Sequence, residues 1–183
     1  MRHFVLSDIV NAFYNLQIYG FSGKNSKFVS TMASTLTQVP TLQEFRTMLR
    51  RHNLKATRQR LAVHEVMTDL VHASADMVKE ELEKRGTGKV TLGSVYNILS
   101  QLSDCHIYVR RLSVSNKMFF DAINSPHIHL YDRENDTYRD LVNDDLQELV
   151  ATHLRRRRFK GYTLEGVDIQ FIARPSNRKN KSL

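Results

Sequence analysis

One short stretch constrains the fold of this chain more than any other: residues 120–141, FDAINSPHIHLYDRENDTYRDL. Its alternation of apolar and polar residues is typical of strands, in which residues two apart point to the same face. His127 and His129 therefore share one face, while Ile128 between them points to the other, as a core residue would. The polar run 132–136 predicts a turn, and the residues after it predict a return strand.

This hairpin brings together side chains of the kinds that ligate metal ions. If residues 133–136 form the loop, His129 lies opposite Asp140 on the same face of the hairpin. Asp121 enters from the preceding strand. Imidazoles and carboxylates that converge in this way predict a site for a divalent metal.

The length, composition and cysteine count of the chain exclude several classes of protein. The chain has 183 residues, 41% of them hydrophobic and 25% charged, so it can bury a globular core. No apolar run approaches the ~20 residues of a membrane span, and the N-terminus lacks the cleavage pattern of a secretory signal. The single cysteine, Cys105, excludes an intramolecular disulfide and a zinc site built from several cysteines. We expect a cytoplasmic protein with no membrane partner.

The net charge of +8 is unevenly distributed. Residues 113–154 carry 3 basic and 8 acidic side chains, whereas residues 155–183 carry 9 basic and 2 acidic ones. Residues 41–112 are basic as well, with 12 cationic and 8 anionic side chains. An acidic segment with metal-type ligands between basic segments indicates a regulatory core attached to a part that meets a polyanion.

Four short helices are predicted between residues 41 and 104. Each follows a Ser or Thr that can cap its N-terminus, and apolar residues recur behind it at helical spacing. The capping residues are Thr41, Thr57, Ser74 and Thr91, and the expected inward stripe of the last helix is Leu92, Val95, Leu99 and Leu102. Two alternating segments follow at 107–112 and 117–120. Helices followed by a hairpin give the order of a winged helix-turn-helix, whose recognition helix lies in the major groove of DNA.

Beyond residue 141 the sequence predicts an amphipathic helix over residues 143–158 and a closing strand over residues 162–171. A module of this size is small, and pairing of edge strands in a homodimer would stabilise it. The expected fold class is therefore α+β, with an N-terminal winged helix-turn-helix domain and a C-terminal α/β dimerisation domain.

The first 40 residues show no clear periodicity, and Met32 is an alternative start, so no function is assigned to them. The expected segments are a flexible N-terminal extension (1–40), a winged-helix DNA-binding domain (41–121), a dimerisation and metal-sensing domain (122–173) and a basic disordered tail (174–183).

Together these motifs resemble the ferric uptake regulator family of metal-sensing bacterial transcription regulators, over about residues 42–173. The resemblance rests on LKATRQRLAV (54–63), HASADMVKEEL (72–82), TLGSVYNILSQL (91–102) and the segment from Asp121 to Asp140. It implies a homodimer that binds double-stranded operator DNA and represses iron, manganese or peroxide-stress genes, without enzymatic activity. In such a protein a metal locks the angle between the two domains.

By that resemblance the metal ligands are His72 from the DNA-binding domain together with Asp121, His127, His129 and Asp140. Three imidazoles and two carboxylates without a thiolate suit Fe²⁺ or Mn²⁺, and also Zn²⁺, with one ion per subunit. Aspartates at both carboxylate positions resemble the peroxide-sensing branch, in which oxidation of a ligand histidine ends DNA binding. That chemistry would fall on His72 or His127.

The chain departs from the family at the cysteines that bind structural zinc. Asp132 and Asn135 occupy the positions of the usual Cys-x-x-Cys pair, and a second pair near residues 173–176 is also absent. No structural zinc held by four cysteines is therefore expected. Burial across a dimer interface would have to replace its contribution to stability.

DNA contacts are expected mainly from the last of the four helices. Ser94 and Tyr96 are candidates for base contacts, and Asn97 replaces an arginine that is common in the family. The candidates for backbone or minor-groove contacts are Lys55, Arg60, Arg110 and Arg111.

Two alternatives stay open at this point. The same fold could respond to haem, or to redox change, through Cys105 and a histidine, although a lone cysteine after a helix is more often a small core residue. A metal-dependent hydrolase built on His127, His129 and Asp140 is an alternative of another class, for which no general base or substrate cleft is identifiable.

Overall fold

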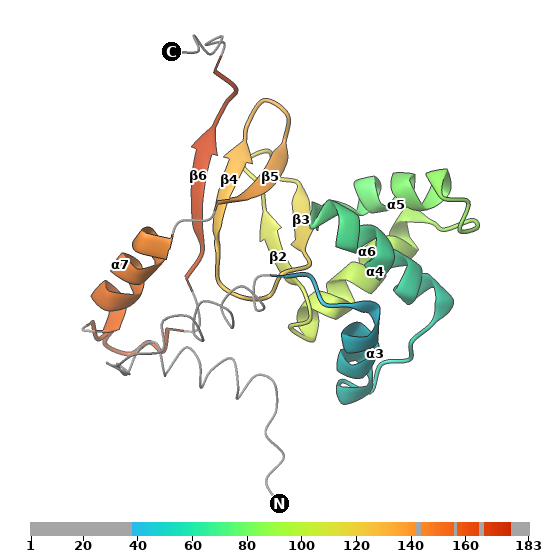
Figure 1. Cartoon of the computed structure of the whole chain (residues 1–183), viewed down its shortest axis with the longest axis horizontal. Helices are drawn as coiled ribbons and strands as arrows, with labels where there is room; N and C mark the ends of the chain where they lie inside the picture. The colour runs from blue at the N-terminus through green and yellow to red at the C-terminus, as the bar shows by residue number, and fades with distance from the viewer. Residues whose placement is uncertain (1–37, 142–143, 156, 165–166, 177–183) are drawn as a thin grey trace, which may run out of the picture.

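The computed structural model describes residues 38–141, 144–155, 157–164 and 167–176 (Figure 1). In these ranges it contains five helices and two three-stranded sheets, which confirms the predicted α+β class. Among the described helices, none combines the length and the apolar character of a membrane span.

Four helices form the N-terminal half, and each begins where its capping residue predicted. α3 spans Leu42–Arg51, α4 Arg58–Leu70, α5 Ala75–Lys84 and α6 Leu92–Asp104. The side-chain oxygens of Thr41, Thr57, Ser74 and Thr91 each accept a hydrogen bond from the backbone N–H three residues on. Gly86 follows α5 with a φ of +65°, a left-handed conformation that glycine adopts at little cost.

The four helices pack around one apolar core. Val95, Leu99 and Leu102 of α6 are fully buried, as their spacing predicted. The prediction that Leu92 points inward is wrong, because this residue is 42% exposed. It occupies the first position of α6, at the edge of the buried stripe.

The first sheet completes a winged helix. It consists of β1 (His72–Ala73), β2 (Val109–Leu112) and β3 (Met118–Asp121), in the order β1-β3-β2. The β2–β3 hairpin follows α6 directly and is the predicted wing. β3 also pairs with β1, so that His72 lies opposite Asp121.

The second sheet holds the predicted hairpin. β4 (Ile128–Asp132) and β5 (Thr137–Leu141) are antiparallel, and their register places His129 opposite Asp140, as predicted. β6 (Ile169–Ala173) pairs with β4 in parallel, which gives the order β5-β4-β6. The helix α7 (Asp144–Arg155) precedes β6 in the chain and lies to one side of this sheet (Figure 1).

Two boundaries in the C-terminal half were predicted wrongly. The helix does not continue to residue 158, because a turn in which the N–H of Arg157 donates to the carbonyl of Leu154 ends it. The closing strand does not begin at Tyr162, whose side chain is 84% exposed. β6 begins at Ile169, where its pairing with Ile128 of β4 begins.

A small apolar cluster joins the two halves. Phe119 of β3 is buried against Tyr131 of β4 and Tyr138 of β5. At the tip of the wing, the hydroxyl of Ser115 donates to Asp136, as does the hydroxyl of Tyr131, at 2.9 and 2.6 Å. These contacts hold the tip of the wing and the start of β3 beside β4 and β5.

The predicted extension and tail lie mostly outside the described residues, which include only residues 38–40 and 174–176 of them. Val39 packs against the helical core, and the carbonyl of Pro40 accepts a hydrogen bond from buried His64 at 2.8 Å. The start of the described chain is therefore attached to α4.

Candidate metal centre

All five side chains predicted as metal ligands meet where the two sheets approach each other. His72 comes from β1 and Asp121 ends β3, in the winged-helix half. His127 directly precedes β4, His129 lies within β4, and Asp140 lies within β5. The donors thus come from four strands and from the residue directly before β4, and His72 is far from the others in sequence.

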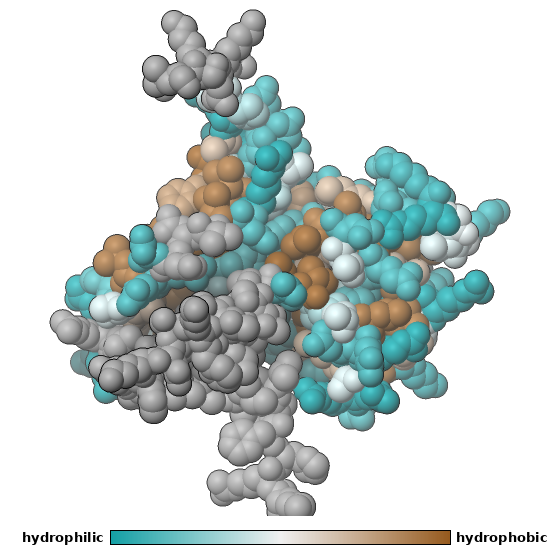
Figure 2. Space-filling model, viewed as in Figure 1, coloured by the Kyte–Doolittle hydropathy of each residue, from teal (hydrophilic) through white to brown (hydrophobic). Residues whose placement is uncertain are grey.

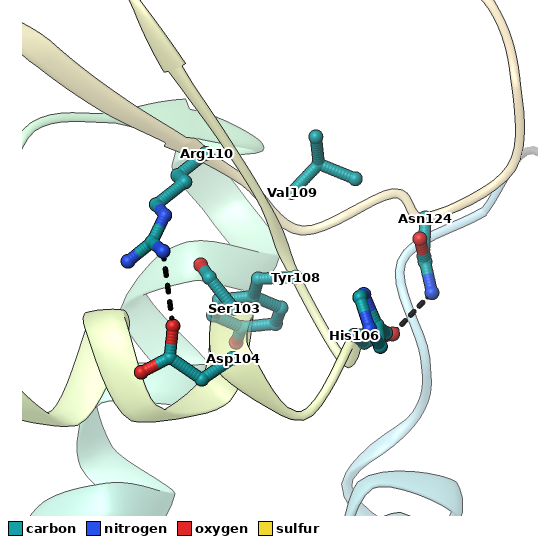
Figure 3. Close-up of a pocket in the computed structure, with 7 residues that line it drawn as sticks. All are labelled: Ser103, Asp104, His106, Tyr108, Val109, Arg110 and Asn124. Atoms are coloured by element: carbon teal, nitrogen blue, oxygen red, sulfur yellow. Dashed lines mark hydrogen bonds and ion pairs between the residues drawn. The ribbon is translucent and has the colours of Figure 1, made fainter. Parts of the chain in front are cut away.

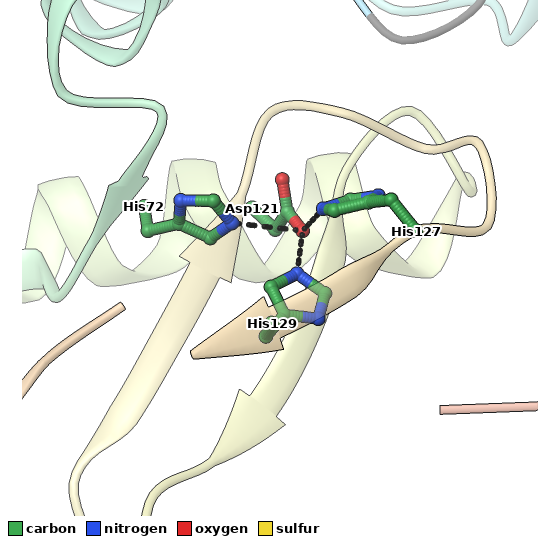
Figure 4. Close-up of side chains that lie close together, drawn as sticks. All are labelled: His72, Asp121, His127 and His129. Atoms are coloured by element: carbon green, nitrogen blue, oxygen red, sulfur yellow. Dashed lines mark hydrogen bonds and ion pairs between the residues drawn. The ribbon is translucent and has the colours of Figure 1, made fainter. Parts of the chain in front are cut away.

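Asp121 stands at the centre of this cluster. Its Oδ2 atom lies 3.3 Å from Nε2 of His72 and 3.2 Å from Nε2 of both His127 and His129. Figure 4 shows the three imidazoles pointing at this carboxylate from different sides. Its other oxygen accepts a hydrogen bond from the N–H of Ile123 at 2.8 Å, which fixes the orientation of the carboxylate.

Asp140 closes the cluster on the solvent side. Its Oδ1 atom lies 3.0 Å from Nε2 of His72, 3.1 Å from that of His127 and 3.8 Å from that of His129. The side chain of Asp140 is 32% exposed, whereas those of the other four residues are 7% exposed or less. The four buried groups therefore form the compact part of the set, and Asp140 is its outer member.

These separations fit a shared metal ion. Donor atoms about 2.1 Å from one ion lie about 3.0 Å apart at right angles and about 3.4 Å apart in a tetrahedron. Five of the six imidazole-to-carboxylate separations lie between 3.0 and 3.3 Å. In addition, the buried Nε2 atoms of His72 and His127 make no well-aligned hydrogen bond with any described residue. Buried polar atoms without a partner are rare, and a cation would satisfy these two.

Charge and burial oppose each other in the cluster. Burial disfavours the charged forms of Asp121 and Asp140, but the surrounding histidines outweigh it and hold the pKa of both carboxyls well below the ordinary range. Burial also opposes protonation of His127, yet the two neighbouring carboxylates of Asp121 and Asp140 raise its pKa to about 10. Two ionised carboxylates among imidazoles form a site that attracts cations.

Arg111 is the cation that the winged-helix half itself supplies to the cluster. Its side chain is only 8% exposed, and its NH1 atom lies 2.9 Å from Nδ1 of His129 and 2.9 Å from Oδ1 of Asp168. Its NH2 atom lies 3.4 Å from Asp121, and the guanidinium lies over the ring of Tyr138 at 5.5 Å. The sequence reasoning did not identify Arg111 or Asp168 as part of this site.

The prediction that Arg111 contacts DNA phosphates is therefore wrong. Neighbouring residues of a strand point to opposite faces, so Arg110 and Arg111 of β2 do not face the same partner. This alternation was a signal already present in the sequence. Arg110 points outward and forms an ion pair with Asp104 at 3.1 Å (Figure 3).

Figure 3 also shows a shallow hollow between the end of α6 and the start of β2, apart from the cluster. Its polar groups pair with each other, as Arg110 does with Asp104 and the amide of Asn124 with the carbonyl of His106. Cys105 caps α6 and is half-buried against the helical core. A haem or redox role for Cys105 stays a prediction.

The remaining DNA candidates lie in the winged helix. Tyr96 is 43% exposed and sets its ring edge-on against Phe120, while Asn97 and Lys55 are exposed. Ser94 is half-buried, with its hydroxyl 2.9 Å from that of Thr91. Arg60 donates to Gln101 at 2.6 Å and to the carbonyl of Lys55, which ties the start of α4 to α6.

A hydrogen-bonded turn occupies the positions of the family's zinc-binding pair. Oδ1 of Asp132 accepts from the backbone N–H groups of Glu134 and Asn135, at 2.9 and 3.2 Å. Its Oδ2 accepts from the side-chain amide of Asn135 at 2.7 Å. Side-chain hydrogen bonds thus close the β4–β5 turn at the positions for which the resemblance to the family implied a zinc-binding pair.

Comparison with known proteins agrees with this geometry. The model of the ferric uptake regulator family matches residues 51–170, a range that contains the whole candidate metal centre. No curated protein sequence matches the chain at a comparable level of significance.

Several solved structures share the fold. The ferric uptake regulator of Vibrio cholerae is 21% identical with a TM-score of 0.60, over 71% of this chain and 98% of that one. That of Pseudomonas aeruginosa, solved with manganese, is 21% identical with a TM-score of 0.59, over 71% and 96%. The peroxide stress regulator of Campylobacter jejuni is 24% identical with a TM-score of 0.55, over 72% and 96%.

Proteins of the matched family are transcription regulators and not enzymes, so the hydrolase alternative no longer applies. The family model spans most of the sequence, including every candidate ligand and, apart from residues 171–173 of β6, both sheets. The chain therefore belongs to the ferric uptake regulator family.

Proposed function

We propose that the chain is a repressor that binds operator DNA as a homodimer and whose DNA affinity depends on one divalent metal ion per subunit. Residues 41–121 form its DNA-binding domain and residues 122–173 its dimerisation and metal-sensing domain. One observation carries the proposal. The donor set takes His72 and Asp121 from the winged-helix half, and its remaining members from the second sheet.

The chain's own ligands explain how such a site would control geometry. Asp121 and Asp140 are both ionised, so a divalent cation that both carboxylates share lowers the repulsion between them. Ligands from both halves that share one cation favour the arrangement in which His72 stays beside Asp140. A tenfold shift toward that arrangement requires only ~1.4 kcal/mol of differential affinity.

The donor chemistry selects the class of metal. Nitrogen and carboxylate donors without a thiolate suit Fe²⁺ and Mn²⁺, whereas affinity order alone favours Zn²⁺ over both. The ion bound in the cell then depends on availability as well as on the ligands. Fe²⁺ or Mn²⁺ is the proposed effector, and genes of iron, manganese or peroxide metabolism are the proposed targets.

The recognition surface is proposed to be α6. This helix precedes the wing, which is the place of the recognition helix in winged-helix proteins. Tyr96, Asn97 and Ser94 lie on its accessible side and would meet base edges in the major groove. The neighbouring cations Lys55, Arg60 and Arg110 would contact the DNA backbone.

The homodimer is proposed to form through β6 and α7. β6 pairs with β4 on one side only among the described strands, so its other edge offers unpaired backbone groups. Phe171 and Ile172 of β6 are 44% and 56% exposed, and Leu149 of α7 is 65% exposed. Apolar side chains gather over this side of the molecule in Figure 2. A second copy that pairs along β6 would cover both the strand edge and these side chains.

The test combines metal analysis with DNA binding. Purified protein is analysed for bound metal, and metal-loaded protein selects its binding sequence from a random DNA pool. Affinity for that sequence is then measured by fluorescence anisotropy after chelation and after addition of Mn²⁺ or, without oxygen, Fe²⁺. We expect the metal to strengthen binding in the wild type and not in His129→Ala or Asp140→Ala. His52→Ala, which removes an exposed imidazole outside the cluster, is the control.

Equal affinity of chelated and metal-loaded wild-type protein for the selected DNA would contradict the proposal. Retention of the metal response in Asp140→Ala would instead remove Asp140 from the ligand set and leave the four buried donors.

A further inference from the structure

The position of Arg111 has a consequence for the chemistry of His129. A guanidinium carries only hydrogen-bond donors and stays protonated in proteins. NH1 of Arg111 lies 2.9 Å from Nδ1 of His129, so this nitrogen must act as the acceptor. The proton of the neutral ring is then on Nε2, which lies 3.2 Å from Oδ2 of Asp121 and donates to it.

This tautomer is the wrong one for ligation. A metal takes the lone pair of an unprotonated ring nitrogen, and the nitrogen of His129 that faces the cluster is Nε2. If Nε2 becomes a ligand, its proton leaves to solvent and Nδ1 takes up a proton in its place, so the charge of the ring does not change. Nδ1 is then a donor, and it faces the donor NH1 of Arg111.

His127, the other histidine at the N-terminal end of β4, already has a partner for a proton on the nitrogen that faces away from the cluster. Nδ1 of His127 lies 2.7 Å from the carbonyl of Ser125, and a carbonyl only accepts. The proton on Nδ1 of His127 therefore stays in place when a metal binds, and the metal has to displace a proton only from Nε2. His127 is prepared for ligation by its backbone partner, whereas His129 is held back by Arg111.

Asp168 supplies the acceptor that a ligating His129 needs. Its Oδ1 atom lies 3.7 Å from Nδ1 of His129 and 2.9 Å from NH1 of Arg111. Ligating histidines commonly donate their second N–H to a carboxylate, which orients the ring and increases its basicity. Asp168 comes from the segment that leads into β6, so a third part of the chain contributes to the site.

We propose that Arg111 and Asp168 set the metal affinity of this site by competing for Nδ1 of His129. In the metal-free protein Arg111 donates to Nδ1 and holds the ring in the tautomer that does not ligate. In the loaded protein Nδ1 donates to Asp168, and Arg111 keeps its contact with Asp168 but loses the one with His129. Arg111 is a positioning residue that raises the metal concentration at which the regulator responds. This inference rests on the proposed metal site.

The direct test reads the ring nitrogens of wild-type protein labelled with ¹⁵N-histidine. Long-range ¹H–¹⁵N correlation spectra, assigned with single His→Gln variants, distinguish protonated from unprotonated ring nitrogens. The protein is compared after chelation and after loading with Zn²⁺, a diamagnetic ion. We expect Nδ1 of His129 to be unprotonated without metal and protonated with it, while Nδ1 of His127 stays protonated throughout.

The second test measures affinity for Zn²⁺ by competition with a chelating dye. Arg111→Met removes the competing donor and a positive charge beside the site, and we expect it to bind Zn²⁺ several-fold more tightly. Asp168→Asn removes the carboxylate, and we expect binding about 10–100-fold weaker, the usual effect of losing such a partner. Arg110→Met is the matched control, because it removes the same charge from the outward face of the same strand.

The outcomes separate the two proposals. If the Nε2 signals of His72 and His127 do not respond to Zn²⁺, the metal site itself is refuted, and the role of Arg111 with it. If they respond but Nδ1 of His129 keeps one protonation state, only the role of Arg111 is overturned. Unchanged or weaker Zn²⁺ binding in Arg111→Met would overturn it as well, and the wild-type spectra decide the question if that variant does not fold.

Discussion

Nε2 of His72 lies 3.0 Å from Oδ1 of Asp140, although β1 belongs to the winged helix and β5 to the second sheet. The two side chains approach each other only in one relative position of the two halves. Of the five candidate ligands, His72 reports most directly on that position, because the segment that carries it connects α4 to α5.

Replacing His72 should separate metal binding from DNA binding. His72→Ala keeps four donors, so we expect it to bind Mn²⁺ more than about tenfold more weakly. At saturating Mn²⁺ its DNA affinity should still fall well below that of the metal-loaded wild type, because Asp121 is then the only candidate ligand that links the winged helix to the metal. Titration calorimetry and fluorescence anisotropy measure the two affinities. A full response to Mn²⁺ in His72→Ala, with His52→Ala as the control, would contradict this role.

Tyr96 should contribute to specific DNA binding without affecting the metal. Its ring is half-exposed on α6 and supported by Phe120. Loss of a good base contact costs about 1–3 kcal/mol, so we expect Tyr96→Ala to weaken binding to the selected sequence by roughly 5- to 150-fold. Binding to unrelated DNA and to Mn²⁺ should change little. Tyr162→Ala, which removes an exposed tyrosine from the other half, should leave all three affinities unchanged.

The exposed edge of β6 should be required for assembly. Ile172→Arg places a charge among apolar side chains that the proposed dimer buries, and buried unpaired charges are strongly disfavoured. Light scattering during size-exclusion chromatography should show a dimer for the wild type and the 21.3 kDa monomer for the variant. Val114→Arg puts the same charge on an exposed apolar site of the wing and should stay dimeric. A dimeric Ile172→Arg protein would place the interface elsewhere.

Buried His64 should make the winged helix sensitive to acid. Burial lowers its pKa from 6.5 to about 4, against the opposing effect of its hydrogen bond with the carbonyl of Pro40. Below pH 6.5 the unfolded chain therefore binds a proton that the folded chain excludes. Above pH 6.5 the ring is neutral in both states and His64 does not affect the free energy of unfolding. As the pH falls toward 4, protonation of the unfolded chain lowers that free energy by up to roughly 3 kcal/mol.

Urea unfolding of chelated protein at successive pH values measures this effect. The free energy of unfolding of His64→Gln should fall less steeply between pH 6.5 and 4 than that of the wild type, since glutamine does not titrate. Parallel curves for the two proteins would show that His64 is not responsible.

Local features of this chain were predictable because they depend on neighbours in sequence. Hydrogen bonds from Thr41, Thr57, Ser74 and Thr91 reach three residues along the chain, and such bonds follow from residue types and spacing. The pairing of His129 with Asp140 followed in the same way from a short turn and the two-residue period of strands.

Features that depend on distant partners were missed. The sequence does not show that Asp168, beyond α7, would pair with Arg111, and without that partner an arginine beside a wing looks like a DNA contact. The sequence shows that Arg110 and Arg111 point to opposite faces of their strand. Which of the two arginines points inward depends on the position of the second sheet. The length of β6 was likewise decided by the five residues of β4 that it pairs with.

The sequence by itself determined the helix starts, the wing, the central hairpin and the residue types of the metal centre. Only the tertiary structure decided that His72 lies beside Asp140 and that the guanidinium of Arg111 contacts Nδ1 of His129. The physical reason is the range of the forces involved. Caps and turns satisfy backbone groups within a few residues, whereas burial of Arg111 is tolerable only after folding has brought Asp121 and Asp168 to it.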